Sequence, residues 1–470
     1  MNLFTIDFSR ESNVPLYRQL YDYIVSEIQS GRLTVGEKLP GKKGLAAHLH
    51  ISVSTVETGY ALLAQEGYIY SRPRSGYYVS PIDTLIFSPY RSASPVNELR
   101  HSPLSQSHHH NYRYDLRTNI VDEKSFPYKT WAKLSRETLI NGSHLLKTGD
   151  TRGDFELRET LAKYLHEFRG VNCAPHQLVI GAGVEYLLSM VCALLSPARG
   201  FAVENPGYIK AAKVLKNSGG ELSYIPLDSE GMVPGALRAS LADICYLTPS
   251  HQFPTGIVTS VGRRYQLLNW ASESYRRYII EDDYSGEFTF FGKPIPAMQG
   301  LDNWGKVIYI STFSRILAPS IRIAYMVLPE KLSQMFESKF RSYSSTVSRF
   351  EQHTLMQFIS GGHLGRHLNR VKNLYRKRRD FLMEKLASLS ISEKIKVRGG
   401  RTGLHLLVTL DTISDAGKVM DAALEQRIQI QRLSDYYYGN SQEQSTLLFS
   451  FAGLDEKDLD DAIYRLFKGL

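Results

Sequence analysis

Cysteine is scarce in this sequence, and long hydrophobic runs are absent from it. The three cysteines, Cys173, Cys192 and Cys245, are odd in number and widely spaced in apolar surroundings. This predicts buried thiols in a reducing compartment and argues against a disulfide framework or a metal site. No apolar stretch approaches the roughly 18 residues of a membrane-spanning helix, and the first residues lack the pattern of a secretion signal. We therefore expect a cytoplasmic protein without membrane contacts.

The composition is that of a soluble globular protein with several cores. The 470 residues are 43% hydrophobic and 11% aromatic, and this length predicts roughly three folding units of about 150 residues each. The net charge of +9 is compatible with a polyanionic partner. Residues 1–80 hold eight basic and seven acidic residues, so an N-terminal module that binds DNA must do so by clustering its charges.

Residues 1–80 carry the pattern of a winged helix-turn-helix domain. Leu16, Leu20, Ile24 and Ile28 recur every four residues before Gly31, which predicts an amphipathic helix that ends at a glycine. Two further helices and a hairpin of aromatic strands complete the predicted domain. Their expected positions are 41–48 for the second helix, Ser52 to Gly67 for the third helix, and 68–70 and 77–79 for the strands, with a turn at 73–76.

The N-terminal end of the third helix of such a domain enters the major groove of DNA, and the wing reaches the minor groove. Lysines before the third helix would neutralise phosphates, and small hydroxyl side chains would contact base edges. The candidate DNA-binding residues are Lys42, Lys43, Ser52, Ser54, Thr55, Arg72 and Arg74. The alternative is a small helical protein-interaction domain with solvated charges.

Several motifs in residues 14–79 resemble the DNA-binding domain of GntR-family bacterial regulators. They are V-P-L-Y-R-Q-L, G-E-K-L-P, L-A-A-H-L, S-x-S-T-V, E-G-Y-I and R-x-R-S-G-Y-Y-V, in that order. The resemblance implies double-stranded operator DNA as a partner. Val53 departs from the pattern, because relatives usually carry an arginine at that place in the third helix.

Residues 81–112 contain six serines and four prolines without a helical or strand period, which predicts a flexible linker. The run 108–110 is three histidines. Adjacent histidines on a mobile segment lack the support that metal sites have, so we expect them to be solvated.

From Tyr114 onward, short apolar runs alternate with helical patterns, which predicts an α/β body with a mostly parallel sheet. Ligands of such sheets bind at the carboxyl ends of the strands. The glycine-rich residues 181–184 can hold a phosphate at the start of a helix, and Asp282 and Tyr284 can bind a ring nitrogen and a ring oxygen. The predicted strand runs are 178–180, 201–203, 244–247, 278–280 and 307–309.

The segment 309–325, Y-I-S-T-F-S-R-I-L-A-P-S-I-R-I-A-Y, resembles the cofactor-anchoring segment of fold-type I aminotransferases, S/T-x-S-K-x-x-x-P-x-x-R-x-G-Y. With E-N-P-G-Y, T-P-S-H-Q-F-P-T-G and E-D-D-Y-S-G-E-F, the whole chain resembles the MocR subfamily of GntR regulators. The resemblance implies a homodimer whose aminotransferase-like body has a large domain, 113–328, and a small domain, 329–470. It implies a pyridoxal 5′-phosphate (PLP) site formed by Ala182, Gly183, Val184, Tyr208, His251, Gln252, Asp282, Tyr284, Arg315 and Arg322.

Within that site, Tyr208 would stack on the pyridine ring, Asp282 would pair with its nitrogen and Tyr284 would bind its 3-hydroxyl. Arg322 and the 181–184 turn would hold the phosphate, with His251 and Gln252 at the ring edge. Lys210 and Arg432 are weaker candidates for a substrate carboxylate. Val184 also departs from the family pattern, because many relatives have a hydroxyl residue there.

Arg315 stands where the family has the lysine that forms a Schiff base with PLP. A lysine amine can lose its proton and attack an aldehyde, whereas a guanidinium stays protonated and does neither. We therefore expect no catalysis and a weak or non-covalent hold on PLP, or its loss.

These observations predict a DNA-binding transcription regulator whose body dimerises and senses PLP or a small amino compound. One alternative is a regulator that uses the body only for dimerisation, and a less favoured one is a working aminotransferase. The basic stretch 370–379 could contact DNA, although we favour a solvated helix face. The operator, the regulated genes and the effector lie beyond what the sequence predicts.

Overall fold

The computed structural model describes residues 6, 8, 14–81, 112–118, 120–196, 200–292, 295–439 and 445–469. The chain forms two compact units, residues 1–108 and 109–470, and each is described by itself. Apart from Pro81 and Tyr112, the predicted linker lies outside the described residues, as does the histidine run 108–110. The linker and the proposed boundary between large and small domains stay predictions.

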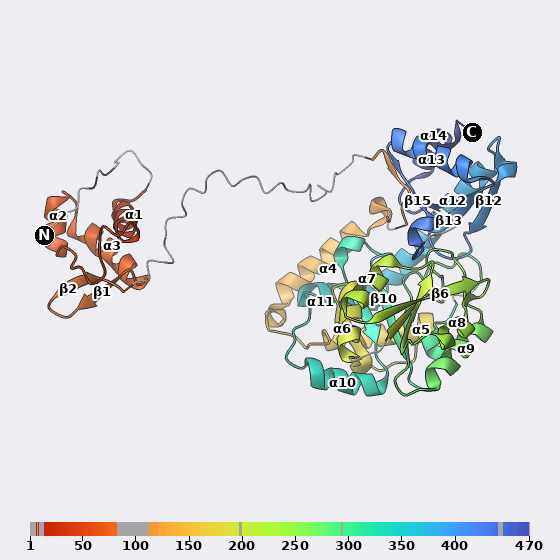
Figure 1. Cartoon of the computed structure of the whole chain (residues 1–470), viewed down its shortest axis with the longest axis horizontal. Helices are drawn as coiled ribbons and strands as arrows, with labels where there is room; N and C mark the ends of the chain where they lie inside the picture. The colour runs from red at the N-terminus through yellow and green to blue at the C-terminus, as the bar shows by residue number, and fades with distance from the viewer. Residues whose placement is uncertain are drawn as a thin grey trace. The chain divides into compact units, whose positions relative to one another are not determined.

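The first unit is the predicted winged helix-turn-helix (Figure 1). The third helix begins where the sequence places its cap, because the Ser52 hydroxyl accepts a hydrogen bond from the Thr55 amide at 3.0 Å. Leu20, Val56 and Tyr60 are fully buried where the helices pack together. The elements are α1 (Leu16–Gln29), α2 (Lys42–His48), α3 (Val53–Gln65) and the antiparallel strands β1 (Ile69–Arg72) and β2 (Gly76–Val79).

The second unit contains an eight-stranded sheet, and every apolar run singled out in the sequence forms one of its strands. The central pairs β10–β9, β9–β8, β8–β5 and β5–β6 are parallel, whereas β11 and β7 run antiparallel to their neighbours. In sheet order the strands are β4 (Leu178–Gly181), β11 (Ala324–Val327), β10 (Val307–Thr312), β9 (Tyr278–Asp282), β8 (Ile244–Leu247), β5 (Gly200–Asn205), β6 (Glu221–Asp228) and β7 (Gly231–Met232).

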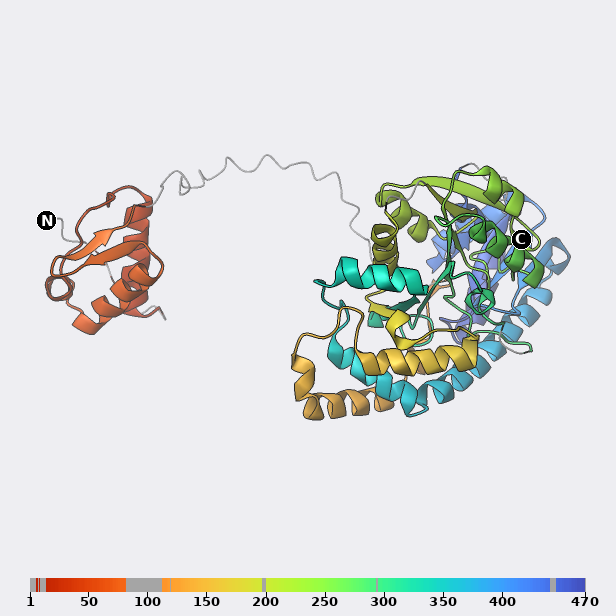
Figure 2. The same cartoon turned by 90° about the horizontal axis from the view of Figure 1, so that it is seen from below.

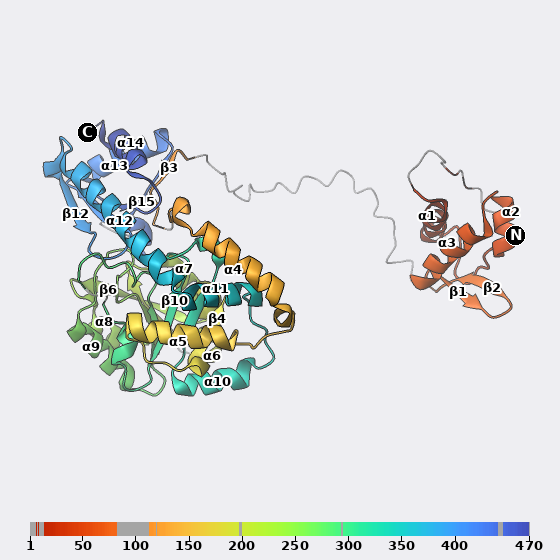
Figure 3. The same cartoon turned by 180° about the vertical axis from the view of Figure 1, so that it is seen from behind.

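Helices cover both faces of this sheet, as the views in Figures 2 and 3 show. The alternation of side chains along β9 decides which helix each residue meets, since successive residues point to opposite faces. Ile279 packs in one cluster with α9, and Ile280 packs in another with α6, α7 and α10. The helices are α4 (Tyr128–Asn141), α5 (Phe155–Arg169), α6 (Val184–Leu194), α7 (Ile209–Asn217), α8 (Pro234–Ala239), α9 (Val261–Ser272), α10 (Glu330–Phe340) and α11 (Arg349–Ser360).

The C-terminal part of the unit has its own four-stranded antiparallel sheet, in the order β12-β13-β16-β15. The short strand β3 (Tyr114–Asp115) pairs with β14 (Ile428–Gln429), so the residues that open the predicted large domain are joined to the C-terminal part. The remaining elements are α12 (His363–Ala387), β12 (Ile395–Gly399), β13 (His405–Leu410), α13 (Ile413–Glu425), β15 (Gln431–Arg432), β16 (Thr446–Ser450) and α14 (Glu456–Phe467).

The cysteines are free thiols, with Cys192 and Cys245 buried and Cys173 half-buried. Within the described ranges, no helix is long and apolar enough to span a membrane, and no group of three or more metal-binding side chains is found.

A buried ion pair lies beside the carboxyl end of β9. The Arg169 side chain donates to Asp283 Oδ2 at 2.7 Å, and the Tyr309 hydroxyl donates to the same oxygen at 2.8 Å. Arg169 and Asp283 are each about 1% exposed. Removing one member of a buried pair leaves the other charge uncompensated, so this pair anchors α5 to the end of the sheet.

We expect Arg169→Met to lower the stability of the second unit by about 3–5 kcal/mol. The measurement is urea unfolding followed by tryptophan fluorescence, because the three tryptophans, Trp131, Trp270 and Trp304, all lie in this unit. The matched control is Arg238→Met, whose partner Glu273 lies 2.7 Å away in a half-exposed pair and which should cost less than about 1 kcal/mol. Equal losses for the two variants would contradict this reading.

Candidate functional site

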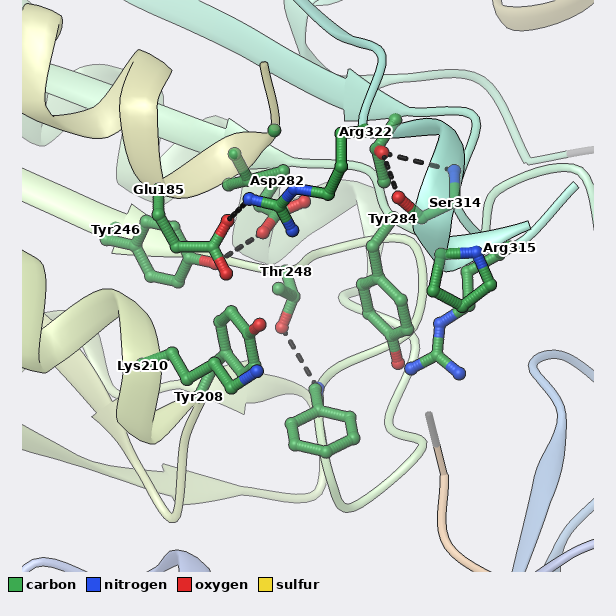
Figure 4. A pocket seen from close by; sticks show the side chains of 15 residues that line it. Glu185, Tyr208, Lys210, Tyr246, Thr248, Asp282, Tyr284, Ser314, Arg315 and Arg322 are labelled. Atoms are coloured by element: carbon green, nitrogen blue, oxygen red, sulfur yellow. Dashed lines mark hydrogen bonds and ion pairs between the residues drawn. The ribbon is translucent and has the colours of Figure 1, made fainter. Parts of the chain in front are cut away.

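A cavity of about 210 Å³ opens at the carboxyl ends of the central strands (Figure 4). This is the place where a parallel sheet presents its loops and helix N-termini. Its walls come from residues that follow β4, β5, β8, β9 and β10. The lining residues are Gly183, Val184, Glu185, Tyr208, Lys210, Tyr246, Thr248, Phe253, Asp282, Tyr284, Thr312, Ser314, Arg315, Pro319 and Arg322.

Asp282, the last residue of β9, is 4% exposed and lines the cavity. Its Oδ2 accepts a hydrogen bond from the Tyr246 hydroxyl, while its Oδ1 has no partner among the described residues. Burial raises the pKa of Asp282 to about 7, because the carboxylate loses its hydration, and the charges of Asp283 and Glu185 act in the same direction. A cationic donor in the cavity would satisfy Oδ1 and stabilise the charged form.

Two tyrosines give the cavity aromatic walls. Tyr208 precedes α7, and its ring packs edge-on against Phe253 with centroids 5.7 Å apart. Tyr284 also meets Phe253 edge-on, at 5.9 Å. The buried Tyr284 hydroxyl has no hydrogen-bond partner in the described part of the chain. Burial raises the pKa of Tyr284, so the phenol is a neutral donor at physiological pH.

The N-terminus of α6 forms a polar end of the cavity. Gly183 precedes the helix with φ of 97°, a backbone conformation that favours glycine. A Cβ at this position would lie 2.4 Å from Nη2 of Arg322, so the guanidinium packs directly over the glycine. The same Nη2 lies 3.0 Å from Oε2 of Glu185, in the first turn of α6.

Arg315 follows β10 and is half-buried in the cavity wall. Its guanidinium carbon lies 5.8 Å from the centroid of the Tyr284 ring, and its Nη1 donates to the carbonyl oxygen of Thr118. Burial lowers the pKa of Arg315, but from a value so high that the group stays cationic. The side chain therefore connects the cavity to the segment 112–118.

Not all predicted site residues line this cavity. Gly183, Val184, Tyr208, Asp282, Tyr284, Arg315 and Arg322 do, and so does Lys210. Ala182 lies behind Gly183 and offers its carbonyl oxygen to Arg322 at 3.3 Å. Arg432 lies on β15, where its amide donates to Asp435.

His251 and Gln252 also lie outside the lining, where local hydrogen bonds engage them. His251 Nδ1 is 2.8 Å from the Thr402 hydroxyl, and burial holds the pKa of His251 well below its usual range. The Gln252 amide donates to the carbonyls of Pro206 and Phe253. Both residues support the loop between β8 and α9, and the expected contact with the ring edge stays a prediction.

Other lining residues did not emerge from the sequence. Tyr246 stood within an apolar strand run and was assigned only to the strand. A tyrosine among apolar neighbours could have indicated a buried hydroxyl group that needs a partner. It pairs with Ile280 across β8 and β9, which places its hydroxyl near Asp282, two residues further on. Glu185 resembled any acid in the first turn of a helix, and nothing in the sequence placed it against Arg322. Thr248, Phe253, Thr312, Ser314 and Pro319 stood in the quoted motifs, but the sequence assigned them no role.

The lining fits a PLP-type ligand by its unsatisfied groups. Asp282 Oδ1 and the Tyr284 hydroxyl are buried, lack partners in the described ranges and border one cavity. Such groups cost free energy until a ligand pairs with them. A ring with a protonated nitrogen and a neighbouring hydroxyl would satisfy both, and Arg322 with the α6 N-terminus would hold an anionic substituent.

On the first unit, the candidate DNA-binding residues lie at the start of α3 and on the wing. Ser52 caps α3 and its hydroxyl lies 2.7 Å from that of Ser54 and 2.8 Å from that of Thr55. Val53 is 40% exposed beside them. A helix start of small side chains with one apolar residue suits contact with base edges and thymine methyl groups.

The basic candidates differ in the groups that already contact their charged ends. Lys42 lies 3.3 Å from Glu57 Oε1, whereas Lys43 is exposed. Arg72 stacks over the ring of Tyr78 at 4.6 Å, which holds it on the wing. Arg74 occupies the turn with φ of 63°. Their contacts with DNA remain predictions.

Comparisons with known proteins cover both units. Residues 16–79 match the family model "Bacterial regulatory proteins, gntR family", and residues 114–466 match "Aminotransferase class I and II". An uncharacterized HTH-type transcriptional regulator of Bacillus subtilis, YdeL, is 37% identical over 97% of each chain. The probable rhizopine catabolism regulatory protein MocR of Rhizobium meliloti is 30% identical over 97% of this chain and 94% of its own.

The pyridoxine biosynthesis transcriptional regulator PdxR of Corynebacterium glutamicum is 28% identical, covering 94% of this chain and 93% of its own. Among solved structures, kynurenine aminotransferase of Pyrococcus horikoshii in complex with PMP superposes with a TM-score of 0.66 and 28% identity, over 75% of this chain and 89% of that chain. The aminotransferase fold implies a PLP-binding domain, and the winged helix implies DNA binding. The chain therefore belongs to the GntR family of transcriptional regulators, in the MocR-like group that joins a winged helix to an aminotransferase-like domain.

Proposed function

We propose that this regulator senses PLP, or a closely related ring compound, by reversible non-covalent binding, and that occupancy of the cavity alters how the winged helix engages operator DNA. The observation that carries the proposal is the pair of unsatisfied groups on one cavity wall, Asp282 Oδ1 and the Tyr284 hydroxyl. Other buried polar atoms of the body also lack partners among the described residues, but these two border a cavity, where a ligand can reach them.

Arg315 argues against turnover. Bound PLP supplies an aldehyde and an electron sink to aminotransferases, and the protein must supply an amine that can lose its proton. The guanidinium cannot do this. Lys210 is the other basic side chain of the lining besides the two arginines, and it projects from α7 rather than from the position after β10. A cavity that binds a ligand without reacting with it has the properties of a receptor rather than of an enzyme.

The proposed coupling runs through Arg315 and the segment 112–118. Thr118 accepts a hydrogen bond from Arg315 through its carbonyl oxygen, and its amide donates to Gln431 at 3.3 Å. Leu116 is held in the same segment by Gln429 at 2.9 Å. This segment directly follows, in sequence, the residues that join the body to the winged helix. A bound ligand would contact Arg315 in place of water. If this changes the strength of the hydrogen bond between Arg315 and Thr118, it shifts the balance between conformations of residues 112–118.

We also propose that the regulator acts as a homodimer in the cytoplasm, because paired winged helices would read paired half-sites of the operator. The competing function is a regulator that binds DNA independently of PLP. Equal operator affinity with and without PLP would favour it.

Replacing Arg315 by lysine should restore covalent capture. After incubation with PLP, borohydride reduction and dialysis, Arg315→Lys is expected to carry a pyridoxyl adduct at position 315, detected by mass spectrometry. The native protein should release its PLP, since it has no suitable nucleophile. Arg315→Met is the control for loss of the charge alone. An adduct on Lys210 or another cavity residue of the native protein would refute non-covalent sensing.

Loss of the Arg315 contact should loosen the segment 112–118. In Arg315→Gln without ligand, hydrogen exchange of a peptide covering 113–118 is expected to accelerate severalfold. A peptide from α9 (Val261–Ser272), on the opposite face of the sheet from α6, should keep its native rate. Unchanged exchange in 113–118 would show that the contact carries no coupling.

Removing a phosphate-binding lysine should weaken DNA binding at all sequences alike. For Lys43→Ala, we expect the slope of log K against log salt to fall by about 1, measured by fluorescence anisotropy on a duplex selected from a random pool. The control is Arg32→Ala, which makes the same charge change but removes a side chain 2.6 Å from Glu27. Identical slopes for the two variants would count against Lys43 as a phosphate contact.

A further inference from the structure

The polar end of the cavity contains an anion that belongs to the chain itself. Glu185 lies in the first turn of α6 with its Oε2 3.0 Å from Arg322 Nη2. The ideal Cβ position at Gly183 is 2.4 Å from that nitrogen and 3.2 Å from the Glu185 oxygen. The ion pair therefore lies over the glycine, at the helix end where a ligand's phosphate would be held. Figure 4 marks this pair with a dashed line between Glu185 and Arg322, among the residues that line the cavity.

The carboxylate is held in its charged form there. Burial acts to raise the pKa of Glu185, but its own backbone N–H and the Arg322 guanidinium outweigh burial and lower the pKa. A helix N-terminus also favours an anion. Glu185 thus uses the two features, the cation and the helix end, that would otherwise bind a phosphate.

We propose that Glu185 is an internal competitor of the ligand phosphate and sets the affinity of the cavity for phosphorylated ligands. This inference rests on the proposed function, since it concerns the same cavity. A phosphate that enters must displace the carboxylate from Arg322 or lie beside it against charge repulsion. Arg322 and Glu185 are 52% and 33% exposed, so the carboxylate can move into water at low cost.

The competitor explains how the cavity can report a concentration. A ligand held too tightly stays bound at every concentration of the free compound, whereas a weakened site fills and empties over the range to be sensed. Asp282 and Tyr284, rather than Glu185, would contact the ring, and the Glu185 charge adds less than burial does to the raised pKa of Asp282. Glu185 therefore lowers affinity for the phosphorylated ligand while leaving recognition of the ring unchanged.

The test compares pyridoxine 5′-phosphate with pyridoxine, which lack an aldehyde and so cannot react with surface lysines. For Glu185→Gln, we expect the dissociation constant of the phosphorylated compound to fall about three- to fivefold, the size of one half-exposed charge interaction. The constant for pyridoxine should stay within about twofold. Isothermal titration of the full-length protein measures both values.

The matched control is Glu330→Gln, which makes the same charge change at an exposed residue of α10 paired with His176. It should leave both dissociation constants unchanged. Equal affinity of Glu185→Gln and the native protein for pyridoxine 5′-phosphate, or equal tightening for both compounds, would overturn this inference alone. Failure of the native protein and the variant to bind either compound would overturn the proposed function together with it.

Discussion

The permanent positive charge of Arg315 is the constraint on which the rest of the site depends. It follows β10, and its Nη1 donates to the carbonyl of Thr118. A guanidinium offers hydrogen bonds and charge but no nucleophile. Arg315 can therefore hold a ligand only by contacts that form and break freely. The winged helix and the aminotransferase-like body together are consistent with a regulator that exploits such reversible binding.

The adjacent carboxylates Asp282 and Asp283 lie on opposite sides of the sheet and have different roles. Asp283 faces one side of the sheet, where Arg169 and Tyr309 hold it in a buried network. Asp282 faces the other side, where Tyr246 satisfies one oxygen and the cavity borders the other. The alternation of side chains along the strand separates them. Each carboxylate keeps one oxygen without a partner among the described residues, but only that of Asp282 borders the cavity, and burial raises the pKa of Asp282 to about 7.

Much of the fold could be predicted because its signals are local. Apolar runs marked the strands, and Ser52 marked the start of α3. Residues with defined chemistry after each strand converged on one cavity, as the rule for parallel sheets requires. Gln252 did not, because its amide completes the hydrogen bonding of nearby backbone carbonyls. Glu185 and Tyr246 were missed because their significance lies in contacts with residues distant in the sequence, Arg322 and Asp282.

The sequence by itself determined the order of elements and the chemical capacity of each group, since helix caps, strand periods and the basicity of a guanidinium are properties of neighbouring residues or of one side chain. Only the tertiary structure decided which groups are already satisfied. Glu185 is engaged by Arg322 and Arg315 by Thr118, whereas the Tyr284 hydroxyl lacks a partner among the described residues. Hydrogen bonds and ion pairs act over a few ångströms of space, and the fold alone brings residues 137 and 197 positions apart within that range.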